Sequence, residues 1–61
     1  MTLQEYARIY VDTINGPANG WGQHVHPTLG PTHAIMGLMW RKFGREESNA
    51  AIDAAFKESK P

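Results

Sequence analysis

The chain has 61 residues, with six basic and six acidic side chains, no cysteine and a formal net charge of zero. A chain this short forms at most one domain, buries only about 60% of the surface that its unfolded form exposes, and without cysteine has neither disulfides nor thiolate metal sites. Neutrality argues against a nucleic-acid-binding domain, which is usually basic, and from the short apolar runs and the N-terminus MTLQEYAR we expect neither a membrane span nor a signal peptide.

The first predicted helix spans residues 3–14. Thr2 and Glu5 have the spacing of a capping box, in which each side chain accepts a hydrogen bond from the other residue's backbone N–H. Apolar side chains then recur at helical spacing and form one stripe: Leu3, Tyr6, Ala7, Tyr10, Val11 and Ile14. The helix should end at Asn15-Gly16-Pro17, because glycine suits a left-handed C′ position and proline cannot continue a helix.

Residues 15–31 form a predicted loop that is rich in Gly, Pro and His. The loop holds seven of the ten Gly and Pro residues of the chain, together with Trp21, His24 and His26. Loops longer than about 12–15 residues are usually functional or disordered. We expect Trp21 to fold back and close one end of the small core. The alternative is an exposed anchor for a partner, since tryptophan is enriched at protein interfaces.

The second predicted helix spans residues 32–43. Its inward stripe is expected to contain Ile35, Met36, Met39, Trp40 and Phe43. Thr32 is the candidate N-cap, unless Pro31 occupies the first turn, and Gly44 is the predicted stop. Gly37 lies in mid-helix, where glycine is unfavourable, so either another backbone comes close to it or the helix tolerates it.

The third predicted helix, over residues 47–57, has an unusually wide apolar arc. The arc consists of Ala50, Ala51, Ile52, Ala54, Ala55 and Phe56. It is wider than the stripe that a small surface helix usually buries. We therefore expect neighbours from the same chain, or a second chain docked along Ala51, Ala54 and Ala55, to cover it. Together the elements predict a single all-α domain over residues 1–61, with three helices.

Three histidines are candidate metal ligands. His24 and His26 would point to the same side of an extended segment, His33 could supply a third nitrogen, and Glu5 or Asp12 an oxygen. Zinc with three protein ligands and a water is a catalytic arrangement, whereas four protein ligands are typical of a structural site. The alternative is that the imidazoles line a polar loop and bond to backbone or water.

A basic cluster, Arg41, Lys42 and Arg45, lies beside Trp40 and raises the question of nucleic acid. These cations also suit the C-terminus of one helix, as acidic residues suit the start of the next. A helix-turn-helix centred on Gly44 would present a recognition helix with three acidic residues. Phosphate would repel that helix, so we do not expect nucleic acid as a partner.

The sequence contains neither a nucleophile beside a base nor a phosphate-binding loop of the Walker type, so we do not expect an enzyme. We expect a small, cytoplasmic protein-binding module without a cofactor: an adaptor, subunit or inhibitor, similar in bulk features to small phage- or plasmid-encoded regulators. It would bind another protein or a second copy through Trp21, His24, His26, Ala51, Ala54 and Ala55. The alternative is a protein that binds zinc or another divalent metal through His24, His26 and His33. A small nucleic-acid-associated regulator is the third possibility.

Overall fold

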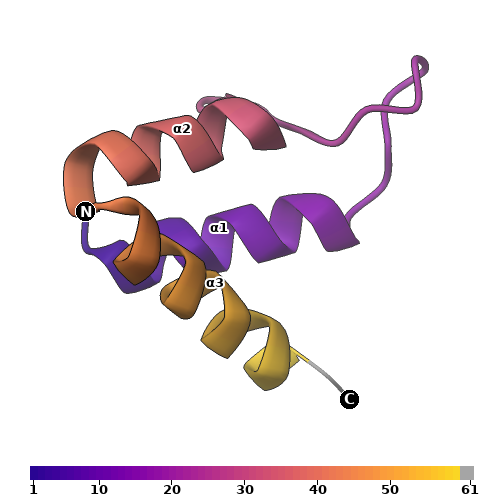
Figure 1. Ribbon diagram of the computed structural model, residues 1–61. Coiled ribbons are helices and arrows are strands. Elements are labelled where there is room, and N and C mark those ends of the chain that lie inside the picture. Colours follow the sequence, from indigo (N-terminus) through magenta and orange to yellow (C-terminus); the bar gives the residue numbers. More distant parts are fainter. Residues whose placement is uncertain (60–61) are drawn as a thin grey trace.

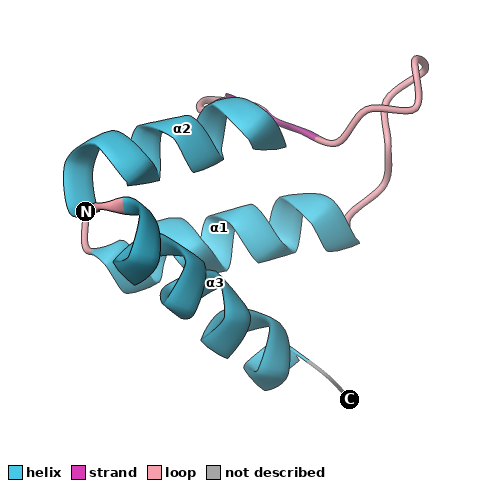
Figure 2. Cartoon of the chain, in the orientation of Figure 1, coloured by secondary structure: helices cyan, strands magenta, loops and turns pink. Residues whose placement is uncertain are grey.

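The computed structural model describes residues 1–59, which form three helices and one short β-hairpin (Figure 1, Figure 2). The elements in chain order are α1 (Leu3–Asn15), β1 (Val25–His26), β2 (Gly30–Pro31), α2 (Thr32–Phe43) and α3 (Arg45–Ser59). The prediction of three helices is confirmed. Among the described residues, no helix is both long enough and apolar enough to span a bilayer.

The prediction of an all-α domain is wrong within the segment 15–31, because that segment contains an antiparallel hairpin. Val25 pairs with Pro31, and His26 pairs with Gly30. Each strand is only two residues long. This is too short for the alternation of apolar and polar residues by which a strand is recognised in a sequence. Pro31 is compatible with β2 because this strand lies at the edge of a sheet, where a missing N–H is tolerated.

Helix α1 begins with the predicted capping box. The Glu5 amide donates to the Thr2 hydroxyl at 3.2 Å, and the Thr2 amide donates to the Glu5 carboxylate at 3.0 Å. Gly16 ends the helix, but with φ −81° and ψ 179° it is extended and not left-handed as predicted. The reason is the next residue, since Pro17 disfavours helical angles in the residue before it and favours extended ones.

Gly44 alone separates α2 from α3. Its φ of +98° lies in the left-handed region, which glycine adopts without steric cost, and the turn is closed by hydrogen bonds from the Gly44 amide to the Trp40 carbonyl and from the Ser48 amide to the Gly44 carbonyl. Helix α3 therefore starts at Arg45, two residues before the predicted boundary. At the other end of α2, Pro31 is the N-cap in place of Thr32.

The core lies where the three helices meet, with α1 packed against both α2 and α3 (Figure 1). Its buried hydrophobic residues are Tyr6, Ala7, Val11, Ile35, Met39 and Ile52. The Tyr6 and Phe43 rings meet edge to face, with centroids 5.7 Å apart. Phe56 is only half-buried at the margin of this core, and 38% of Trp40 is exposed.

Candidate functional site

Residues 16–31 form an arm between the C-terminus of α1 and the N-terminus of α2. The part of the arm before the hairpin projects from one end of the helical bundle, whereas the hairpin returns along the helices and contacts α1 and α2 (Figure 1, Figure 2). The tip of the arm, residues 19–23, is closed by the side chain of one asparagine. Asn19 Oδ1 accepts from the backbone N–H of Trp21 at 2.8 Å and of Gln23 at 3.0 Å. The Asn19 amide also donates to the Gln23 carbonyl at 2.8 Å. The tip is therefore a hydrogen-bonded turn of defined conformation.

Trp21 lies on this tip with 89% of its surface exposed. The prediction that Trp21 closes the core is wrong. The core is closed without Trp21, because the helix residues Val11, Ile35 and Met39 are already fully buried. The turn that Asn19 holds keeps Trp21 at the end of the arm. The structure thus matches the alternative interpretation, in which Trp21 is an exposed side chain.

The arm carries no formal charge. All twelve Asp, Glu, Lys and Arg residues lie outside residues 13–40, which include the whole arm and most of α2. A second apolar side chain of the arm, Val25, is 42% exposed. The surface around Trp21 is consequently uncharged, and burying it desolvates no ionised side chain of the arm.

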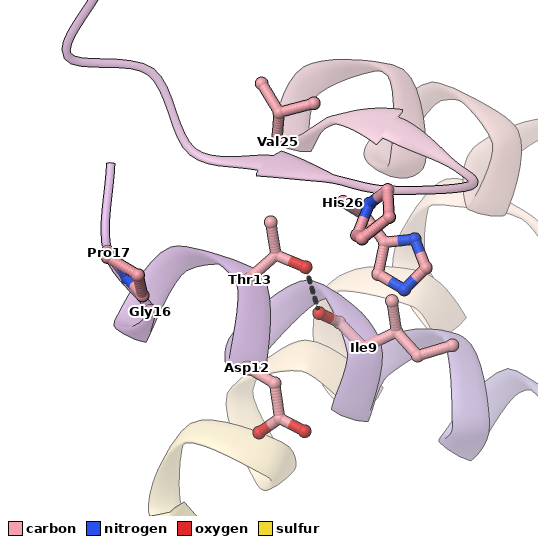
Figure 3. Close-up of a pocket in the computed structure, with 8 residues that line it drawn as sticks. Ile9, Asp12, Thr13, Gly16, Pro17, Val25 and His26 are labelled. Atoms are coloured by element: carbon pink, nitrogen blue, oxygen red, sulfur yellow. Dashed lines mark hydrogen bonds between the residues drawn. The ribbon is translucent and has the colours of Figure 1, made fainter. Parts of the chain in front are cut away.

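A pocket of about 410 Å³, which we call the base pocket, lies where the arm meets α1 (Figure 3). It is lined by Ile9, Asp12, Thr13, Gly16, Pro17, Val25, His26 and Pro27. Figure 3 shows the His26 ring directed from the hairpin toward Ile9. The Thr13 hydroxyl donates to the Ile9 carbonyl oxygen at 2.7 Å, so it is already bonded within its own helix. The lining is therefore mostly apolar, and the Asp12 carboxylate points to the side of α1 away from the hairpin (Figure 3).

The three predicted metal ligands are divided between two pockets. His26 lines the base pocket, and its Nδ1 accepts from the backbone N–H groups of Thr28 and Leu29, each at 3.0 Å. His24 and His33 line a separate pocket of about 250 Å³ at the start of α2. Within residues 1–59, no group of three or more His, Cys, Asp and Glu side chains is placed to hold a metal ion. The structure therefore places His24 and His33 beside one pocket and His26 beside another.

The alanines of α3 line a groove of about 240 Å³ against α1, which we call the alanine groove. Its residues are Gln4, Arg8, Ala51, Ala54, Ala55 and Glu58. Arg8 and Glu58 form an exposed ion pair between the two helices, with 3.2 Å between Nη2 and Oε2. Ala54 is exposed, whereas Ala51 and Ala55 are half-buried. The chain itself covers this arc only in part, so a second chain on it stays a prediction.

Two cations of the predicted basic cluster lie over aromatic rings. Lys42 Nζ is 5.8 Å from the centroid of the Tyr6 ring, and Arg45 Cζ is 4.8 Å from that of Trp40. Trp40 Nε1 in turn donates to Asn49 Oδ1 at 3.3 Å. These contacts link α2 to both of the other helices, since Tyr6 belongs to α1 and Arg45 to α3.

Asn19 and the α1 side of the base pocket are functional features that were not predicted from the sequence. Asn19 could have been found, because asparagine before glycine favours a turn closed by its own side chain. Ile9 and Thr13 carry no such signal, since their place in a pocket depends on where the arm folds. Comparison with known proteins gives no match: no family model matches the chain, and no curated protein or solved structure matches it significantly.

Proposed function

We propose that the chain is a small, non-enzymatic protein-binding module whose contact surface is the arm and whose anchor is Trp21. The observation that carries this proposal is the 89% exposure of Trp21 on a hydrogen-bonded tip. Burying an aromatic side chain removes about 150–250 Å² from water, which at about 25 cal/mol per Å² corresponds to roughly 4–6 kcal/mol before the costs of association.

The conformation of the tip supports the same role. A loop that must become ordered on binding loses conformational entropy, and that loss reduces affinity. The hydrogen bonds that Asn19 makes with Trp21 and Gln23 already hold residues 19–23 in one turn, so the arm presents Trp21 with little further ordering. Aromatic anchors that insert into a partner's pocket dominate the energetics of many interfaces.

The chemistry of the arm indicates the kind of surface it binds. Because residues 13–40 carry no formal charge, an ionised group of a partner would be buried against the arm without a counter-charge, which is costly. We therefore infer an apolar, uncharged partner surface with a cavity for an indole. The two alternatives have weaker support, since His26 is separated from the other histidines and two basic residues pack on aromatic rings.

The test is affinity capture from the native host, with the tagged chain as bait and mass spectrometry as the readout. The matched variants are Trp21→Ala and Gln23→Ala, which both truncate an exposed side chain of the tip. Gln23 uses its backbone in the turn, so its truncation leaves the turn intact. We expect the wild type and Gln23→Ala to capture the same protein and Trp21→Ala to lose it. Equal capture by Trp21→Ala would overturn the proposed anchor.

A further inference from the structure

We propose that the arm binds a second copy of this chain, with Trp21 of each copy inserted into the base pocket of the other. This inference rests on the proposed role of Trp21 as an anchor and names the partner that the anchor binds. It is carried by one juxtaposition: the arm has an exposed indole at its tip and an open, mostly apolar pocket at its base (Figure 1, Figure 3).

The two ends of the arm suit a twofold symmetric pair. When two copies lie with their arms antiparallel about a twofold axis through the middle of the arm, each tip lies on the base of the other arm. One symmetry operation thus forms both contacts, as in every isologous interface, where residue i contacts residue j and j contacts i. No second binding surface is needed, because tip and base belong to the same element.

The base pocket matches an indole in size and chemistry. Its volume of about 410 Å³ lies within the roughly 300–1,000 Å³ that is usual for clefts that bury ligands. Ile9, Pro17 and Pro27 supply apolar lining. The rings of the indole would therefore be buried against apolar side chains.

The charge distribution permits a partner identical to the chain itself. Two identical charged surfaces repel when a twofold axis brings them together, because like charges then face each other. The arm avoids this repulsion, since no residue from 13 to 40 carries a formal charge.

The first experiment measures self-association by sedimentation equilibrium over a wide range of concentrations. Trp21→Ala removes the anchor, and Thr13→Arg fills the base pocket from the α1 side with a bulky cation. Asn15→Arg is the matched control, because it adds the same cation to an exposed position that does not line the pocket. We expect the dimer dissociation constant to rise at least about 100-fold for Trp21→Ala and Thr13→Arg, and to stay near the wild-type value for Asn15→Arg.

Mixing the two defective variants gives the decisive result. A Trp21→Ala copy keeps its pocket, and a Thr13→Arg copy keeps its tryptophan, so a mixed dimer regains one of the two contacts. We expect the mixture to dimerise more tightly than either variant alone. A dimer in which the two Trp21 side chains pack against each other would show no such recovery. The absence of recovery would therefore overturn the proposal that each Trp21 inserts into the base pocket of the other copy.

A cross-link provides a readout that does not depend on affinity. Because the chain has no cysteine, Gly20→Cys at the tip and Pro27→Cys at the base each introduce a single thiol. Differently tagged copies of the two variants should form a mixed disulfide faster than either forms one with itself. A wild type that stays monomeric at millimolar concentration and gives no tip-to-base cross-link would overturn the inference. In that case, Trp21-dependent capture of a different protein would still support the binding module, whereas capture independent of Trp21 would refute both proposals.

Discussion

One ring nitrogen of His26 stabilises the turn that follows this residue. Its Nδ1 accepts two backbone hydrogen bonds, from Thr28 and Leu29, and therefore carries no proton, so the neutral ring has its hydrogen on Nε2. This arrangement is the imidazole counterpart of a turn closed by asparagine or aspartate. The residue that the sequence indicates as a metal ligand thus has a structural task in the hairpin.

Replacing His26 should loosen the hairpin. In His26→Ala both acceptors are lost, and at about 0.5–1.5 kcal/mol for each hydrogen bond we expect a loss of roughly 1–3 kcal/mol in the free energy of unfolding, measured in urea. His26→Asn should recover part of the loss, because its side-chain oxygen can accept from the same amides. The control is His33→Ala at an exposed position of α2, which should change stability by less than about 0.5 kcal/mol. Equal effects at both positions would contradict this role for His26.

Gly37 is a position at which a substitution should stabilise the protein. Of the two explanations for a glycine in mid-helix, the close approach of another backbone is wrong, because a Cβ at this position would have within 4 Å no described atom from outside its own stretch of helix. We expect Gly37→Ala to stabilise the protein by roughly 0.5–1 kcal/mol, which thermal melting would show as a higher midpoint.

Gly44→Ala is the contrasting control for Gly37→Ala. The left-handed φ of Gly44 strains any side chain, and a Cβ there would lie 2.8 Å from the Glu47 carboxylate. This substitution should therefore lower the melting midpoint. A lower melting midpoint for Gly37→Ala would contradict this prediction.

At the scale of elements, α1 begins with a side chain that links its stability to pH. The N–H of Thr2 donates to the Glu5 carboxylate, and this bond is the main reason that the pKa of Glu5 lies below its ordinary value of 4.5. A group whose pKa is lower in the folded state stabilises it above the unfolded pKa. This contribution is lost as the pH falls through the folded pKa.

The wild type should therefore lose more stability than Glu5→Gln as the pH is lowered from 7 into the acid range below 4.5. Glutamine is the appropriate comparison, because it can serve in a capping box but does not ionise. Urea denaturation of both proteins at a series of pH values measures the difference. Parallel curves for the two proteins would show that the carboxylate of Glu5 makes no pH-dependent contribution.

The helices were predictable from the sequence because each carries its own local signals. The capping box of Thr2 and Glu5, the periodic stripe of α1 and the stop at Gly44 involve residues close together in the chain. The arm was not predictable in the same way. The pairing of Val25 with Pro31 spans too few residues to leave a pattern, and the exposure of Trp21 depends on which residues close the core. The base pocket needs the arm to be placed against α1, which is a property of the tertiary structure.

For the whole molecule, the division between core and margin decides which substitutions destabilise it most. Ile52 is buried between helices, whereas Phe56, one turn later, is half-buried. We expect Ile52→Ala to cost roughly 2–5 kcal/mol, a large share of the stability of a small domain. Phe56→Ala should cost less than the approximately 3–5 kcal/mol of a fully buried phenylalanine. A greater loss at Phe56 than at Ile52, measured in urea, would place the centre of the core elsewhere.

The single glycine between α2 and α3 also keeps these two helices from forming one continuous helix. Residues 32–59 are helical except at Gly44, so a right-handed residue there would complete one helix of about 42 Å, at about 1.5 Å per residue. In that shape α3 could not return to the α1 of its own chain, and its apolar face would have to pack on the α1 of another. A substitution that favours right-handed angles at residue 44 would therefore favour the exchange of α3 between two copies.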